Sequence, residues 1–135
     1  QRDRLLALEI RSAQLTEEGR QILAQTAQRI EQDFGDSYVT VQGHTDSQPI
    51  RVSGWKDNWD LGAARSMAVL RYLIDQGVAP ELASAETLSM YRPVAPNTSP
   101  ENMRLNRRAV ILVHSGGPQV LEASPEERAT GRRPR

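Results

Sequence analysis

The 135-residue chain has the length and composition of one globular domain, with 38% hydrophobic and 25% charged residues. Its 17 basic and 17 acidic residues give a formal net charge of zero, which argues against a nucleic-acid partner because no positive field would attract a polyanion. The chain has no cysteine and no run of roughly 18 uncharged apolar residues, which excludes disulfides, thiolate chemistry and a membrane span within it.

The first third of the chain predicts a strand, a helix and a second strand. Residues 4–10 form a short, mainly apolar segment, which predicts a strand, whereas the apolar residues after it recur at helical spacing. Thr16 is the expected N-cap of this helix and Gly35 its expected end. The apolar stripe of the helix has spacings of four, three and four residues: Leu23, Ala27, Ile30 and Phe34. Alternation with β-branched residues predicts the second strand at residues 37–43.

A second long helix and a third strand follow. Asp57 or Asn58 can cap the helix, and Gly77 is its expected end. Its apolar stripe is expected to consist of Ala63, Met67, Leu70 and Ile74. Residues 82–89 predict a weaker strand, followed by a proline-bearing loop at residues 90–99.

The last elements are a short helix and a strongly predicted strand. Ser99 is a good cap and Pro100 occupies the first helical position, which favours proline. Residues 107–115 are rich in β-branched and aliphatic residues and predict the final strand. This order predicts one layered α/β domain at residues 1–115, with some neighbouring strands parallel. Residues 116–135 lose all periodicity, and we expect a flexible tail there.

His44 and Asp46 invite a catalytic interpretation, because a histidine beside a carboxylate can act as a general base. No serine, cysteine or second histidine is marked as their partner by any motif, so acid–base catalysis is disfavoured. His44 and His114 are the only histidines, and no cluster has the spacing of a metal site. The chain is therefore expected to be neither an enzyme nor a metal protein.

Asp46 and Arg65 are a stronger candidate for function. The end of a strand and the first turns of the following helix meet at one edge of a sheet, where ligands of α/β folds often bind. A fixed anion beside a fixed cation could hold the ammonium and carboxylate of one amino-acid carbon. The alternative is a structural salt bridge between the two residues, or exposed charges without a partner.

Trp55 and Trp59 flank the loop between Asp46 and Arg65. Tryptophans usually pack in the core, and that is the expectation here. In a protein that reads carbohydrate or peptide, an amphipathic ring beside the pocket can also form a wall. Of Arg107 and Arg108, only one can point towards the edge of the pocket, because neighbouring strand residues alternate between faces.

Three blocks of the sequence together resemble the OmpA-like peptidoglycan-binding domain, which is shared by outer-membrane OmpA proteins, peptidoglycan-associated lipoproteins and the flagellar stator protein MotB. The blocks are VTVQGHTDSQPI, NWDLGAARSMAVLRYLIDQGV and YRPVAPNTSPENMRLNRRAVILV, and the resemblance covers residues 15–113. The long loop with Asn58 and Trp59 is most similar to the MotB-type branch. One block departs from the family pattern, because Thr87, Leu88 and Ser89 stand where glycines are common.

The resemblance implies an α+β fold, a two-layer sandwich with βαβαβαβ order and a four-stranded mixed sheet packed on helices. It also implies non-covalent binding of the diaminopimelate in the peptidoglycan stem peptide, without a cofactor. The family's recognition aspartate and arginine fall on Asp46 and Arg65, and the resemblance places Thr45, Asn58 and Arg107 at or near the pocket.

The implied location is the periplasm, where the domain would anchor a membrane-tethered protein, such as a flagellar-stator protein, to the cell wall. Because the chain begins at Gln1, we expect a fragment whose membrane segment lies outside it. A second copy of the chain, forming a homodimer, is a further candidate partner. The alternative function is a protein–protein interaction or dimerisation module that has kept the fold and lost peptidoglycan binding.

Overall fold

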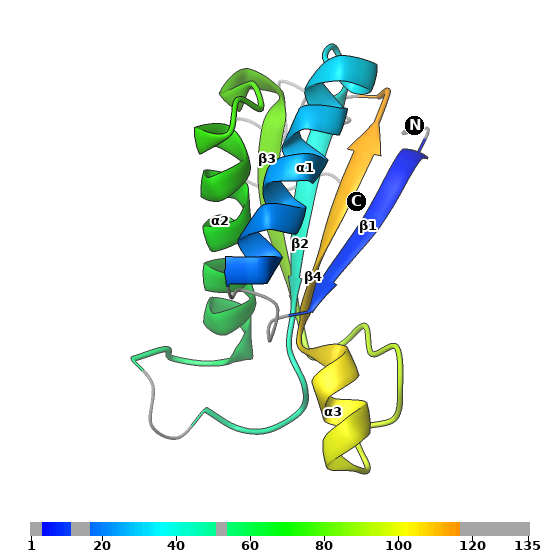
Figure 1. Cartoon of the computed structure of the whole chain (residues 1–135). Helices are drawn as coiled ribbons and strands as arrows, with labels where there is room; N and C mark the ends of the chain where they lie inside the picture. Colours follow the sequence, from blue (N-terminus) through cyan, green and yellow to red (C-terminus); the bar gives the residue numbers. More distant parts are fainter. Residues whose placement is uncertain (1–3, 12–16, 51–53, 117–135) are drawn as a thin grey trace, which may run out of the picture.

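The structure is a computed structural model in which residues 4–11, 17–50 and 54–116 are described (Figure 1). The expected N-cap Thr16 and all but the first residue of the expected tail lie outside these ranges. The helices and strands are β1 (Arg4–Arg11), α1 (Glu17–Phe34), β2 (Tyr38–His44), α2 (Asn58–Asp75), β3 (Ala83–Ser89), α3 (Pro100–Asn106) and β4 (Arg108–His114), with a short 3-10 helix, η2, at Pro80–Leu82. All seven predicted elements are confirmed, while η2 was not predicted.

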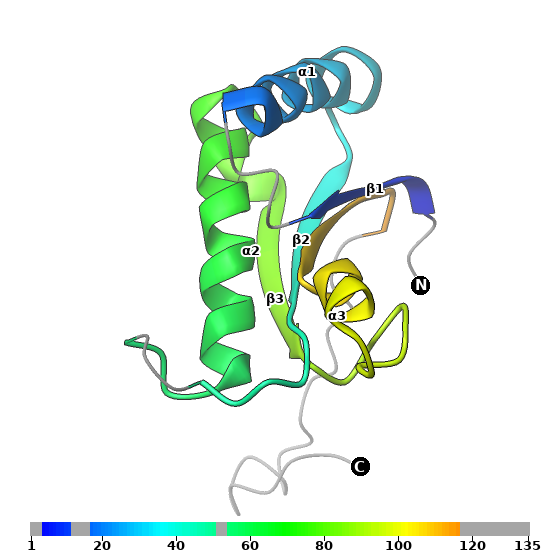
Figure 2. The same cartoon turned by 60° about the horizontal axis from the view of Figure 1, so that its bottom comes forward.

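The four strands form one mixed sheet in the order β1-β4-β2-β3. β2 and β3 are parallel and are joined through α2, as the length of that crossover predicted. β4 runs antiparallel to both β1 and β2. Helices α1 and α2 cover one face of this sheet (Figures 1 and 2), so the expected two-layer α+β architecture is confirmed. None of the described helices is long and apolar enough to cross a membrane.

The helix ends follow the expected capping chemistry. Asp57, one of two candidates, is the N-cap of α2, and its side chain accepts a hydrogen bond from the backbone N–H of Asp60. Gly77 has a φ of 113° directly after the C-cap, a conformation that glycine adopts without strain. Ser99 caps α3 in the same way as Asp57, with Pro100 at the first helical position, as predicted.

The core lies between the sheet and the two long helices. In α1, the predicted stripe is buried at Leu23, Ala27 and Ile30. In α2, only Leu70 of the four predicted stripe residues is fully buried, while Met67 and Ile74 are partly buried and pack against the core. The buried side of α2 consists instead of Gly62, Ser66, Val69, Leu70 and Leu73. The small residues in this set allow the helix to lie close to β2.

Several chain segments converge at one end of the sheet. β2 and β3 both end there, α2 begins there, and α3 leads into β4 there (Figures 1 and 2). The loop after β2 therefore lies beside the first turns of α2 and beside α3. This end carries the residues that the sequence singled out.

Candidate functional site

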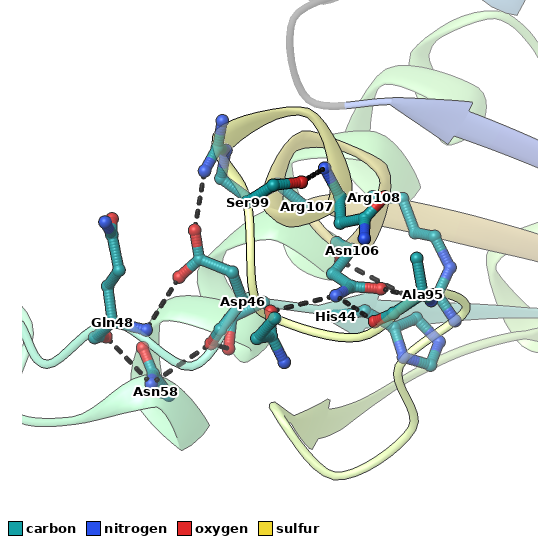
Figure 3. A network of polar contacts seen from close by, with 12 residues as sticks. His44, Asp46, Gln48, Asn58, Ala95, Ser99, Asn106, Arg107 and Arg108 are labelled. Atoms are coloured by element: carbon teal, nitrogen blue, oxygen red, sulfur yellow. Dashed lines mark hydrogen bonds and ion pairs between the residues drawn. The ribbon is translucent and has the colours of Figure 1, made fainter.

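Asp46 lies two residues beyond the end of β2, and only 6% of the residue is exposed. Its Oδ1 accepts a hydrogen bond of 2.9 Å from the backbone N–H of Gln48, which fixes the turn after the strand. Its Oδ2 forms an ion pair of 2.5 Å with Nη1 of Arg107 (Figure 3). A carboxylate can accept about four hydrogen bonds, so these two contacts leave acceptor capacity for a ligand.

Arg65 lies about two turns into α2 and reaches back to the end of β2. Its Nη1 donates a hydrogen bond of 2.5 Å to the backbone oxygen of His44. Burial lowers the pKa of Arg65 below its usual value, as does the positive charge of Arg107, while Asp46 raises it. Within the described residues, its remaining N–H groups have no partner, so the guanidinium can still bind a carboxylate.

The structure therefore brings Asp46, Arg65 and Arg107 to one end of the fold, and we call these three residues the charge cluster. The described residues contain no ion pair between Asp46 and Arg65, so the simple structural salt bridge that the sequence left open is not formed. Arg107 pairs with Asp46 instead. One buried carboxylate beside two guanidinium groups can bind a group that carries both an ammonium and a carboxylate.

Thr45 and Asn58 shape the loop around Asp46. Thr45 is buried, and its hydroxyl donates to the backbone oxygen of Asp46 at 2.8 Å. The amide Nδ2 of Asn58 donates to the backbone oxygens of Asp46 at 3.4 Å and of Gln48 at 3.1 Å. Both side chains therefore hold the backbone that presents the Asp46 carboxylate.

Arg107 and Arg108 point in different directions, as predicted, but strand alternation is not the reason, because β4 begins only at Arg108. Arg107, the C-cap residue of α3, is partly exposed and reaches Asp46. Arg108 is buried, and its guanidinium donates to the backbone oxygens of Arg92 and Asn106. Of these two arginines, only Arg107 therefore belongs to the charge cluster.

His44 is not placed to act as a general base beside Asp46. Its ring is buried, and its Nε2 lies 3.4 Å from Oε1 of Gln42. Burial, together with the charges of Arg108 and Arg92, lowers the pKa of His44 to about 4. The ring is therefore neutral at pH 7, and its contribution to the site is the backbone oxygen that Arg65 binds.

Asn106 is a structural residue that the sequence analysis missed. It is fully buried, and its Oδ1 accepts from the backbone N–H groups of Val94 and Ala95. Its Nδ2 donates to the backbone oxygen of Ala95 and to Oδ1 of Asn97 (Figure 3). The proline-bearing loop at residues 90–99 could have pointed to Asn106, because the backbone groups of such a loop need a polar side chain as partner.

Both tryptophans contradict the packing expectation. Trp55 is 45% exposed and Trp59 is 46% exposed. Trp59 packs instead against Tyr91, which is itself 59% exposed, with ring centroids 5.5 Å apart. Both rings are exposed because of where they lie in the chain. Trp55 belongs to the loop before α2 and Trp59 to its first turn, and both precede the part of α2 that packs on the sheet.

Ser89, in the block that departs from the family pattern, has an unusual backbone conformation. Its φ is 53°, a left-handed conformation that costs a non-glycine residue roughly 1–2 kcal/mol. Its backbone oxygen nevertheless accepts the N–H of Thr45 at 2.9 Å, so the connection to the loop before Asp46 is formed. The connection between the altered block and the Asp46 loop therefore contains a strained residue.

We expect Ser89→Gly to stabilise the domain by about 0.5–1 kcal/mol, because relief of the left-handed strain exceeds the added entropy of the unfolded chain. Urea unfolding of the variant and the wild type measures this difference. Ser89→Ala is the control, since it removes the hydroxyl and keeps the strain. Equal stability of the glycine and alanine variants would show that φ at this position is not strained.

Curated relatives that share sequence with this chain include a motility protein and a peptidoglycan-binding protein. It is 35% identical to motility protein B of Helicobacter pylori over 75 residues, which are 56% of this chain and 29% of that protein. It is 34% identical to the peptidoglycan-binding protein ArfA of Mycobacterium tuberculosis over 79 residues, 58% of this chain and 23% of that protein. The chain therefore spans less than a third of the length of these relatives. Their names describe motility and peptidoglycan-binding proteins, in agreement with the expected non-enzymatic domain.

Solved structures and a family model extend the comparison. The periplasmic domain of Helicobacter pylori MotB superimposes with a TM-score of 0.73 at 25% identity, covering 93% of this chain and 88% of that one. The cell wall anchor of the T6SS from Pseudomonas aeruginosa gives 0.73 at 29% identity, covering 82% and 81%. The model of the OmpA family matches residues 9–107, which include the whole charge cluster. The chain belongs to the OmpA family.

Proposed function

We propose that this domain binds peptidoglycan non-covalently through the free amino-acid end of diaminopimelate in the stem peptide. The observation that carries the proposal is the buried Asp46 carboxylate beside Arg65 and Arg107 at the C-terminal end of β2. Support also comes from membership of the OmpA family and from relatives whose names describe peptidoglycan binding and cell wall anchoring.

Each charge has a role in this proposal. The Asp46 carboxylate accepts hydrogen bonds from the ligand's ammonium, which shares or takes over the Oδ2 position that Arg107 holds in the free protein. The N–H groups of Arg65 that have no partner among the described residues donate to the ligand's carboxylate, with the planar geometry that lysine cannot match. Thr45 and Asn58 keep the Asp46 backbone in place during this exchange.

The wider role that we infer is a periplasmic anchor for a membrane-tethered protein. The resemblance to motility protein B and to the periplasmic domain of MotB favours a stator-type protein. Its membrane segment would lie in the part of the protein outside this chain. Modest affinity at one site suffices for such an anchor, because a cell-wall polymer offers many sites to an assembly with several domains.

A protein–protein interaction module is the second candidate, favoured by the altered block at Thr87, Leu88 and Ser89. The two functions differ in how they treat the second carboxylate of diaminopimelate. We expect muropeptides with diaminopimelate to bind about 10- to 100-fold more tightly than those with lysine in its place, because loss of the carboxylate leaves Arg65 unpaired.

Isothermal titration calorimetry with the two purified muropeptides measures this ratio. Equal affinity for both would contradict recognition of the free amino-acid end. Absence of binding to either, together with concentration-dependent self-association in sedimentation, would favour the interaction module.

A further inference from the structure

A pocket lies next to the loop that carries Asp46 and has no role in the proposed function. It has a volume of about 310 Å³, at the lower end of the roughly 300–1,000 Å³ of small-ligand sites. We call it the Trp59 pocket, and its walls include Pro49, Ile50, Lys56, Asn58, Trp59 and Tyr91. The pocket thus combines an aromatic wall with polar groups at its rim.

The aromatic wall is a platform of two exposed rings. Trp59 and Tyr91 pack with their rings tilted by 36°, and about half of each residue remains open to solvent. Exposed large aromatic rings that stay in contact with each other are typical of surfaces that bind a ligand. The backbone oxygen of Trp59 accepts a hydrogen bond of 2.8 Å from Thr87, which fixes the start of α2 under the platform.

The Trp59 pocket and the charge cluster share structural residues. Asn58 lines the pocket, and its Nδ2 donates to the backbone oxygen of Asp46. Ser89 also lines the pocket, and its backbone oxygen accepts the N–H of Thr45. The pocket therefore adjoins the loop that presents the Asp46 carboxylate, through Asn58 on one side and Ser89 on the other.

We propose that the Trp59 pocket binds a sugar ring of the glycan strand while the charge cluster holds the stem peptide. This inference rests on the proposed function. A pyranose ring has a face of C–H groups that can pack on an aromatic ring, and polar substituents that can bond Lys56 at the rim. Two residues and the length of the diaminopimelate side chain lie between its free amino-acid end and the sugar, so the extended span exceeds roughly 7 Å.

Simultaneous occupation of both sites has a measurable consequence. When one ligand joins two binding groups, the second contact forms at a high effective concentration, so the joined ligand binds more tightly than either part. We therefore expect the disaccharide–tripeptide with diaminopimelate to bind about tenfold more tightly than the free tripeptide with diaminopimelate.

Trp59→Ala should remove this advantage, bringing the two affinities to within about twofold of each other and leaving the affinity for the free tripeptide unchanged. Calorimetric titration of both ligands measures the effect. The matched control is Trp55→Ala, because Trp55 is equally exposed and lines a different groove, with Met67 and Arg71. This control should keep the wild-type preference for the larger ligand, and both variants should keep the wild-type unfolding midpoint.

The outcomes separate this inference from the proposed function. If the wild type binds the tripeptide and the disaccharide–tripeptide equally, the sugar site is wrong while recognition of diaminopimelate stands. If Trp59→Ala weakens both ligands by the same factor, the ring supports the charge cluster and does not bind sugar. If the wild type binds neither ligand, the proposed function fails and the sugar site fails with it.

Discussion

Replacement of Asp46 with asparagine should weaken binding of a diaminopimelate muropeptide at least about 100-fold and abolish sedimentation with purified sacculi. The neutral amide cannot balance the ligand's ammonium, and it leaves two guanidinium groups without their anion. Loss of one partner from a buried, hydrogen-bonded charge pair costs roughly 2–5 kcal/mol in binding. Asparagine is preferable to alanine here, because its oxygen can still accept the N–H of Gln48.

The control for this prediction must separate lost recognition from lost stability. Arg107→Gln removes the same ion pair from the free protein but leaves the Asp46 carboxylate in place. We expect it to weaken binding by no more than about tenfold, with an unfolding free energy similar to that of Asp46→Asn. Equal loss of binding in both variants would mean that the ion pair serves only to fold the loop. Arg65→Ala should resemble Asp46→Asn in binding.

The elements of the fold could be predicted because local patterns specify them. Alternating β-branched residues predicted β2 and β4, and capping residues placed the starts of α2 and α3. The buried side of α2 could not be predicted in this way. A search for apolar residues at helical spacing selects Met67 and Ile74, whereas the sheet packs on Gly62 and Ser66, which carry little or no apolar surface. Closeness of the backbones, a tertiary property, decides which side is buried.

The candidate site was predicted only in part for the same reason. Asp46 and Arg65 belong to one strand–loop–helix unit, so local topology brings them together. The partner of Asp46 is 61 residues away in sequence, and no spacing rule connects it to the loop after β2. The exposed platform of Trp59 and Tyr91 also depends on tertiary contact, since the two rings come from distant parts of the chain. Composition alone favoured burial for both tryptophans.

Gly43→Ala should destabilise the domain strongly, by about 3 kcal/mol or more, although it adds only one methyl group. A Cβ at residue 43 would collide with the backbone oxygen of Gly62 and lie 2.7 Å from its carbonyl carbon. It would also lie 3.1 Å from the backbone N of Ser66. Because these are backbone atoms of α2, no side chain can rotate away, and the helix itself must move off β2. Urea unfolding measures the loss.

Two other glycines provide graded controls for this collision. At Gly62 an added Cβ would displace the hydroxyl of Thr87 from its hydrogen bond with Trp59 and would lie 3.0 Å from the backbone oxygen of Gly43. Alanine gains about 1 kcal/mol of helix propensity there. Gly62→Ala should therefore cost less than Gly43→Ala. At Gly54 nothing lies within 4 Å of the added Cβ, so Gly54→Ala should be nearly neutral. Similar losses in all three variants would contradict the close approach of α2 and β2.

The contact between Gly43 and Gly62 also connects stability to binding. Arg65 reaches the backbone oxygen of His44 at 2.5 Å only because α2 lies so close to the end of β2. An α2 displaced by Gly43→Ala would carry the guanidinium away from Asp46, so the folded fraction of the variant should bind the diaminopimelate muropeptide weakly. Titration at low temperature, where the variant is folded, tests this. Wild-type affinity there would show that Arg65 is positioned by its own side-chain contacts and not by the helix packing.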